Sequence, residues 1–371
     1  MLPPVPPRLP RTSRPGPSPH SGDDEPGDPR VDEHVSDADD RAEGRRQTDH
    51  VAEWPQDVVL GHEVVLRRPP LDERLDLVPL ARGADRGLAR RRTDAIGVLF
   101  GLIEPQIVTN PYAATVLEGI LLAASGLGRN VTLLTRPWTG AESCAGACGD
   151  RSTDGLLLVA PRIGSDMLPA LSALGMPLVV VSGRGTKYGV PSVDTDNRAG
   201  AALAARHLLD LGHRRIAHLL GDAALAPVAE RLEGFRETMA AAGASPPEEL
   251  ILPGRYSVQS GYDRAARLLR SPCPPTAVFA GNDVIALGVL QAASEAGVPV
   301  PARLSVVGFD DVPQAALAHP PLTTIRQPLR DIGHLATRML VRIIEGMGEA
   351  PAHIEVPPEL ILRGTTGPPA A

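Results

Sequence analysis

Three short polar segments carry side chains that could form paired hydrogen bonds with one ligand. They are Asn110-Pro111-Tyr112, Gly281-Asn282-Asp283 and Gly308-Phe309-Asp310-Asp311. Amides and carboxylates that converge on a cleft, together with the guanidinium of Arg231, suit a ligand rich in hydroxyl groups. The rings of Tyr112 and Tyr256 could add flat apolar walls against such a ligand.

A simpler interpretation is that these polar residues begin helices. Asn and Asp are preferred at helix N-caps, so Asn282 and Asp310 could do no more than cap the helices that follow them. Each residue taken alone is more often a cap. Three such segments at equivalent strand ends favour a binding site.

The segments follow apolar runs that are typical of buried parallel strands. Such runs alternate with amphipathic stretches from Thr93 onwards, which indicates βαβ units. The runs are Ala95–Phe100, Val131–Leu134, Gly155–Val159, Leu178–Val181, Ile216–Leu220, Ala277–Ala280 and Ser305–Gly308. There are too many units for one small sheet. The sequence therefore predicts an α/β protein with two doubly wound parallel-sheet subdomains and a ligand at the carboxyl ends of the strands.

Catalytic and metal-binding motifs are weak. Cys144 and Cys148 have no histidine nearby, and structural zinc usually needs four ligands. The glycines of 183–189 lack the dinucleotide-binding spacing, and no nucleophile elbow, Walker loop or zincin motif occurs. His207, His213 and His218 are expected to be surface or hydrogen-bonded residues. The sequence predicts a protein that is not an enzyme and needs no metal and no cofactor.

Composition narrows the class further. The chain has 371 residues and a net charge of −7, so any DNA binding must come from a localised basic element. No apolar run approaches the roughly 20 residues that span a bilayer, and the first residues lack the apolar core of a signal peptide. A cytoplasmic protein without membrane partners is expected. Residues 1–84 are unassigned: 1–50 has the composition of a disordered segment, and prolines interrupt 51–84.

Longer motifs occur in a fixed order towards the C-terminus. They are Asp194–Gly200, Leu211–Ile216, Glu230–Phe235, Ala280–Asp283, Ser305–Asp311, Pro320–Pro328 and Glu359–Thr366. Together they resemble the lactose-repressor/galactose-repressor (LacI/GalR) family of bacterial transcriptional regulators, over about residues 86–366. The resemblance implies a periplasmic-binding-protein-like core. Its first subdomain would be 94–193 with 327–355, and its second 194–326 with 356–366.

The resemblance also implies an effector site between the subdomains, for a small molecule such as a sugar or a nucleobase. The contact positions carry over as Asn110, Pro111, Tyr112, Arg231, Tyr256, Asn282, Asp310 and Gln327. One position departs from the family. After Leu178–Val181 relatives commonly have an Asp-Arg pair, whereas this chain has Ser182-Gly183-Arg184. A carboxylate is therefore expected to be missing there.

The family's DNA-binding hinge helix is recognisable at 85–93. Leu88 with Ala89 occupies the position of a leucine that enters the minor groove, and Arg90 would meet phosphates. Upstream, residues 1–84 do not contain the family's helix-turn-helix pattern. We favour a shifted reading frame or a misplaced start as the origin of this segment. The alternative is a disordered extension in a regulator that lost its reading head.

These observations predict a ligand-responsive transcriptional repressor that acts as a homodimer, with a sugar as the expected effector. Operator DNA is the expected partner if the native protein contains a helix-turn-helix. The helix after Asn110 is expected to contribute Val116, Gly119, Ile120 and Ala123 to the dimer surface. The alternative is a sugar-binding protein of the same fold without sequence-specific DNA binding. The hinge at Leu88 favours the repressor.

Overall fold

The computed structural model describes residues 92–101, 109–136, 138, 140–141, 148–348 and 350–370. They belong to one unit of the chain, Asp85–Ala371. The segment 1–84 and the hinge residues Leu88, Ala89 and Arg90 lie outside the described residues, so what the sequence predicts for them stays a prediction. Within the described part, no helix has the length and apolar character needed to cross a membrane.

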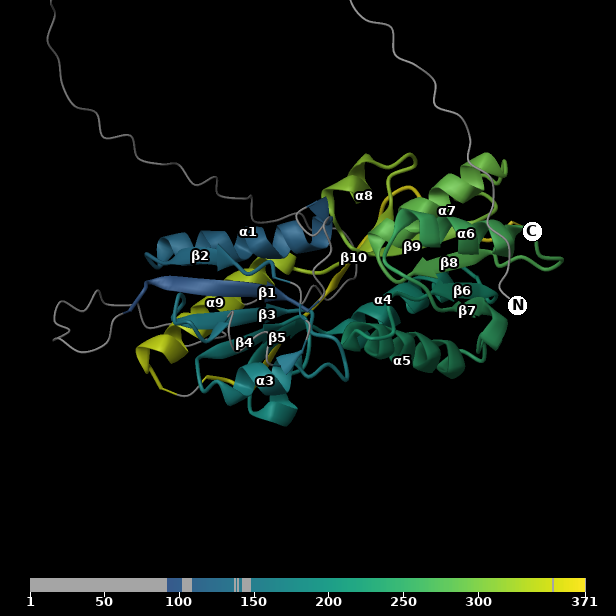
Figure 1. Ribbon diagram of the computed structural model, residues 1–371. Coiled ribbons are helices and arrows are strands. Elements are labelled where there is room, and N and C mark those ends of the chain that lie inside the picture. Colours follow the sequence, from purple (N-terminus) through teal and green to yellow (C-terminus); the bar gives the residue numbers. More distant parts are fainter. Residues whose placement is uncertain are drawn as a thin grey trace, which may run out of the picture. The chain divides into compact units, whose positions relative to one another are not determined.

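The first sheet has six strands, all parallel, in the order β11-β5-β4-β3-β1-β2. In chain order they are β1 (Ala95–Phe100), β2 (Asn130–Leu133), β3 (Gly155–Val159), β4 (Leu178–Val181), β5 (Ser192–Thr195) and β11 (His353–Val356). The helices α1 (Pro111–Gly126) and α9 (Leu329–Glu345) pack together on one face, and α3 (Met167–Ala173) lies on the other (Figure 1). Covering both faces explains why β1, β3 and β4 are buried at every residue.

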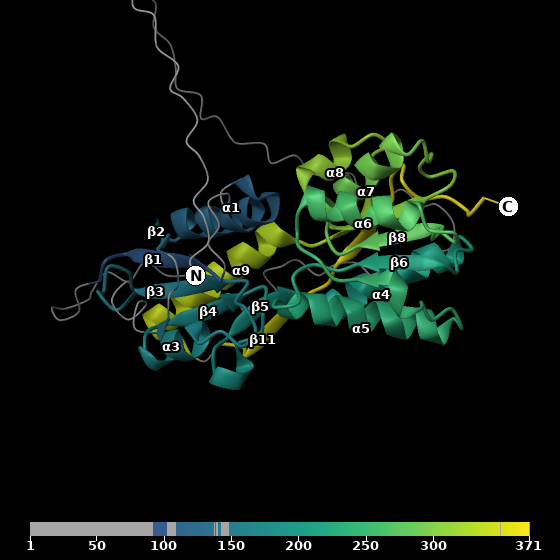
Figure 2. The same ribbon diagram turned by 45° about the vertical axis from the view of Figure 1, so that its right-hand side comes forward.

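The second sheet also has six strands, in the order β12-β10-β9-β8-β6-β7, and only β12 pairs antiparallel. They are β6 (Ile216–Leu219), β7 (Ile251–Leu252), β8 (Ala277–Ala280), β9 (Ser305–Asp310), β10 (Thr323–Arg326) and β12 (Glu359–Ile361). Its helices are α4 (Asn197–Asp210), α5 (Ala226–Ala241), α6 (Val258–Leu269), α7 (Asp283–Glu295) and the short α8 (Pro313–Leu317). The pair α6 and α7 covers one face and the pair α4 and α5 the other (Figure 2).

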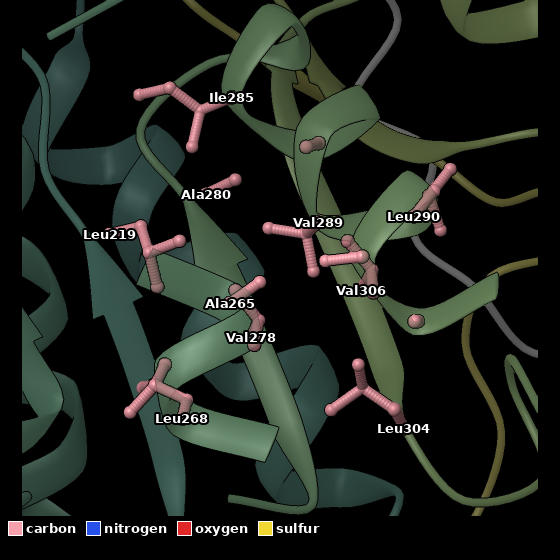
Figure 3. Packing of buried hydrophobic residues seen from close by; sticks show 14 of the residues in the cluster. Leu219, Ala265, Leu268, Val278, Ala280, Ile285, Val289, Leu290, Leu304 and Val306 are labelled. Carbon is pink, nitrogen blue, oxygen red and sulfur yellow. The ribbon is translucent and has the colours of Figure 1, made fainter. Parts of the chain in front are cut away.

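Side-chain alternation divides the core of the second sheet into two layers. Leu219, Val278 and Val306 pack on α6 and α7 through residues such as Leu268 and Val289 (Figure 3). The intervening strand residues, which include Phe279 and Phe309, pack on α4 and α5 instead. Successive strand residues point to opposite faces, so each strand contributes to both layers.

The predicted fold class is confirmed: two doubly wound, parallel-dominated sheets are present. The seven apolar runs form β1, β2, β3, β4, β6, β8 and β9, with ends that shift by a residue or two. Five strands are absent from that prediction, namely β5, β7, β10, β11 and β12. They are short or polar. In β10, for example, Thr323 and Thr324 are fully buried, because hydrogen bonds to Thr365 and Asp283 satisfy them.

The chain passes between the two sheets after β5, β10 and β11. These strands end at Thr195, Arg326 and Val356. The first and third crossings therefore lie slightly beyond the divisions expected at 193 and 355. The segment around Gln327 is the second crossing, since β10 belongs to the second sheet and α9 covers the first.

The expected role of α1 in a dimer surface is wrong for the residues named. Val116, Gly119, Ile120 and Ala123 are buried inside the chain, where α1 packs on α9. The helices approach so closely that a Cβ atom at Gly119 would lie 2.0 Å from the carbonyl oxygen of Arg330. The apolar stripe that a sequence shows does not reveal whether its partner helix comes from the same chain or another.

Candidate ligand site in the cleft

A cleft of about 1100 Å³ opens at the carboxyl ends of the strands of both sheets. Its lining includes all eight residues that the sequence singled out: Asn110, Pro111, Tyr112, Arg231, Tyr256, Asn282, Asp310 and Gln327. They come from the starts of α1 and α7, from within α5, from the loop before α6, from the end of β9 and from the second crossing. They span more than 200 positions of the chain. The fold thus brings together residues that are far apart in the sequence.

The two asparagines serve as helix caps and also line the cleft. Asn110 Oδ1 accepts hydrogen bonds from the backbone of Tyr112 (3.1 Å) and Ala113 (3.3 Å) at the start of α1. Asn282 Oδ1 accepts one from the backbone of Ile285 (2.9 Å) at the start of α7. The cap and the site are therefore compatible, because an amide that caps through its oxygen still has an NH₂ group for another partner.

Asp310 is not a cap. The helix that follows, α8, has Val312 as its N-cap, and Asp310 instead accepts a 2.6 Å hydrogen bond from the side-chain amide of Gln327. Only 4% of Asp310 is exposed. This burial raises the pKa of its carboxyl group to about 6, although the positive charge of Arg231 opposes the shift.

The neighbouring aspartates have structural roles. Asp283 accepts hydrogen bonds from the Thr324 hydroxyl (2.5 Å) and the Val312 backbone (2.9 Å), which fix the loop after β9. Burial, together with the charge of Asp310, raises the pKa of Asp283 well above its usual range. Asp311 pairs with two arginines at the sheet edge. Neither Asp283 nor Asp311 lines the cleft.

Arg231 is held rigidly on α5. Its Nε donates to Asn197 Oδ1 (2.9 Å), and its Nη1 donates to the Gly281 carbonyl (2.6 Å). The guanidinium lies 3.7 Å from the centre of the Phe309 ring, a cation–π distance. A guanidinium has a third nitrogen, and the side chain lines the cleft, so Arg231 can donate hydrogen bonds to a ligand.

The two tyrosines give the cleft apolar walls with polar tips. The ring of Tyr256 lies directly on Gly221, where a Cβ atom would approach it to 2.0 Å. Burial raises the pKa of Tyr256 to about 12, and it raises the pKa of Tyr112 as well. Both phenols therefore keep their protons at neutral pH and can donate hydrogen bonds.

The structure adds cleft residues that the sequence did not identify. They include Arg162, Asp194 and Asp222. Arg162 and Asp222 form an ion pair of 2.7 Å. Asp194 is the most informative, because only 1% of it is exposed and burial raises its pKa to about 7. The strand β5 is polar and contains no apolar run, so the sequence does not predict it. Asp194 is therefore recognised only as the first residue of the motif Asp194–Gly200.

Several cleft residues hold unusual backbone conformations. Ala160, Ser182 and Asp310 have φ of 49°, 54° and 120° at or just after the ends of β3, β4 and β9. Positive φ is disfavoured for residues with a Cβ atom and occurs mostly where surrounding structure enforces it, often at functional sites.

Among the described residues, no group of three or more His, Cys, Asp or Glu side chains is placed to hold a metal ion.

Comparison with known proteins identifies the family. The model of the periplasmic binding protein-like domain matches residues 205–366. The transcriptional regulator DegA of Bacillus subtilis is 33% identical over 286 residues, which cover 76% of this chain and 83% of DegA. MalR of Streptomyces coelicolor, another transcriptional regulator, is 34% identical over 72% of this chain and 80% of its own.

A solved structure agrees with these relatives. The complex of the regulator CelR with cellobiose matches with a TM-score of 0.69 and 31% identity, over 79% of this chain and 88% of its own. These relatives are named as transcriptional regulators and not as enzymes, which agrees with the prediction from the sequence. With the two-sheet fold and the cleft, the comparisons confirm the resemblance that the motifs carried: the chain belongs to the LacI family of transcriptional regulators.

Proposed function

We propose that this regulator is a ligand-responsive repressor whose core binds a small, uncharged, polyhydroxylated effector, a sugar, in the cleft. Asn110, Tyr112, Arg231, Asn282 and Asp310 would hold it. Pro111, Tyr256 and Gln327 complete the contact set. The protein would act in the cytoplasm as a homodimer, and on operator DNA if the native protein contains a helix-turn-helix.

The observation that carries the proposal is the make-up of the cleft. One cavity of about 1100 Å³ collects a buried arginine, a buried aspartate, amides and two phenols from both sheets. Sugar hydroxyls both donate and accept hydrogen bonds, so they can pair with carboxylate and guanidinium groups at the same time. The tyrosine rings can face the apolar side of a pyranose. The complex of CelR with cellobiose supports the same ligand class.

The DNA-binding part of the proposal rests on the hinge. Leu88 and Ala89 would enter the minor groove, and Arg90 would contact phosphates. Phosphate contacts give affinity without sequence preference, whereas base readout needs a major-groove element. The chain as it stands is therefore expected to bind duplex DNA weakly and in a salt-dependent way.

Titration calorimetry of the full chain with cellobiose and a panel of uncharged mono- and disaccharides tests the effector. Saturable binding of at least one sugar, lost in Asp310→Ala, is the expected result. A wild-type protein that binds none of them would contradict the assignment of a sugar effector.

Gel-shift assays with and without the sugar that binds test the regulator. A shift of duplex DNA at low salt that the sugar changes, and that Leu88→Ala weakens, supports the repressor. Sugar binding without any shift of DNA at low salt would favour the alternative, a sugar-binding protein of this fold that does not act on DNA.

A further inference from the structure

Ser182 and Asp194 are neighbours at the cleft. The strands β4 and β5 pair in parallel with Val181 opposite Val193, and the backbone N–H of Ser182 donates to the Val193 carbonyl at 2.9 Å. The residues that follow this pair, Ser182 and Asp194, thus stand side by side at the strand ends, and both line the cleft. Ser182 is also the position at which relatives commonly have an aspartate.

Three buried polar atoms in this corner of the cleft lack a hydrogen-bond partner. Among the described residues, Asp194 Oδ2, Ser182 Oγ and Tyr112 Oη have none at normal geometry. The two hydroxyls lie close enough that Ser182 influences the pKa of Tyr112. We call Tyr112, Ser182 and Asp194 the β4–β5 corner.

An unpaired buried carboxylate oxygen is costly, and no hydrogen bond from the described residues reaches Oδ2 of Asp194. Asp194 Oδ1 accepts a 2.7 Å hydrogen bond from the backbone N–H of Thr195, whereas Oδ2 accepts none from the described residues. Buried polar groups are almost always paired, and a buried charge without a partner is destabilising. Since Oδ2 is on a cleft-lining residue, the missing partner is best supplied by a ligand.

We propose that Asp194 is a ligand-binding and specificity-determining residue, whose carboxylate accepts a hydrogen bond from a ligand hydroxyl group in the β4–β5 corner. Ser182 at the end of β4 has no carboxylate, and Asp194 on the neighbouring strand β5 provides one beside it. This inference rests on the proposed function and adds a second acidic contact, separate from Asp310, to the same cleft.

The surroundings favour a neutral hydroxyl over a cationic group. The negative charge of Glu230 and the positive charges of Arg231 and Arg184 all act on Asp194, so a ligand ammonium would meet two positive charges as well as one negative charge. A hydroxyl can donate to Oδ2 and accept from Tyr112 or Ser182, which satisfies the corner without adding a charge. A ligand that lacks a hydroxyl here would leave Asp194 Oδ2 unpaired and would bind more weakly.

The competing explanation is structural: Asp194 could serve only to hold the backbone of Thr195. Asp194→Asn separates the two, because the amide oxygen can still accept from Thr195 while the charge is removed. Asp196→Asn is the matched control. Asp196 caps α4 through a 2.8 Å hydrogen bond from Ala199 and does not line the cleft, and asparagine caps equally well.

The test combines calorimetry on the full chain with thermal unfolding of the ligand-free protein. The probes are cellobiose and the uncharged sugars that bind the wild type. Asp194→Asn should weaken their binding roughly 10- to 100-fold, as expected for a hydrogen bond to a charged group. Asp196→Asn should leave it unchanged. The double change Ser182→Asp with Asp194→Ser, which returns the carboxylate to β4, should recover most of the affinity.

Unfolding gives a result that does not depend on the ligand. Asp194→Asn should raise the Tm of the free protein at pH 8, where the wild-type carboxylate is ionised and unpaired, and should change it little at pH 5. Unchanged sugar affinity in Asp194→Asn, or a lower Tm at pH 8, would overturn the assignment of Asp194. If the wild type bound no sugar, the proposed function itself would fail, which is a distinct outcome.

Discussion

The side-chain amide of Gln327 donates a hydrogen bond of 2.6 Å to Oδ1 of Asp310. Asp310 ends the strand β9 of the second sheet, and Gln327 lies where the chain leaves β10 for α9. The carboxylate at the cleft is therefore oriented by the connection between the two sheets. A ligand that bound Asp310 would contact a group that is hydrogen-bonded to this connection.

Asp310→Ala should abolish effector response while the protein stays folded. Removing one partner of a buried charged contact typically costs about 2–5 kcal/mol of binding free energy. Calorimetry with the sugar that binds the wild type measures the loss. Asp311→Asn is the control, since Asp311 pairs with Arg326 and Arg363 away from the cleft; equal losses in both variants would argue against a specific contact by Asp310.

Arg231→Lys should also weaken binding, even though the charge is kept. The guanidinium contacts Asn197, the Gly281 carbonyl and the Phe309 ring at once. A lysine ammonium cannot reproduce this planar fork. We expect at least a tenfold higher Kd by calorimetry, with near-native circular dichroism. An unchanged Kd would remove Arg231 from the ligand contacts.

His218 should make the protein sensitive to acid. It is fully buried and stacks on Phe279 with ring centres 4.4 Å apart, and burial lowers its pKa from 6.5 to about 3. The folded state therefore holds His218 neutral, whereas the unfolded chain takes up a proton below about pH 6.5. This contribution to stability is present above pH 6.5 and is lost as the pH falls towards 3, by up to about 1.4 kcal/mol per pH unit.

Urea unfolding at several pH values measures this effect. The difference in unfolding free energy between wild type and His218→Gln should change with pH between 6.5 and 4, since glutamine does not titrate. His319→Gln is the control for replacing a histidine by glutamine at an exposed position. A curve for His218→Gln that runs parallel to the wild type would show that His218 does not control the acid sensitivity.

Two glycines of α1 should respond to alanine in opposite directions. At Gly119 a Cβ atom would lie 2.0 Å from the Arg330 carbonyl oxygen, whereas at Gly126 nothing lies within 4 Å. Gly119→Ala should destabilise the protein by about 1–3 kcal/mol through overpacking of α1 on α9. Gly126→Ala should stabilise it by about 0.4–1 kcal/mol, because alanine restricts the unfolded chain. Chemical denaturation distinguishes these signs.

The sequence determined most of the strand framework and the identity of the candidate contacts. Apolar runs such as Gly155–Val159 reflect a local rule, since a strand covered on both faces must be apolar along its length. The polar residues just after or at the ends of such runs, Asn282 and Asp310 among them, lie at the cleft because parallel strands end at one edge. These inferences need only neighbouring residues and a general rule of topology.

The tertiary structure decided which polar residues line the cleft and which helix each helix packs against. Asp283, Asp310 and Asp311 look alike in the sequence, yet only Asp310 lines the cleft, because Thr324 and the arginines of other segments engage the other two. Asp194 lies in a strand too polar to be recognised. The apolar stripe of α1 meets α9, some 200 residues away. Such pairings depend on contacts between distant segments, and local pattern carries no information about them.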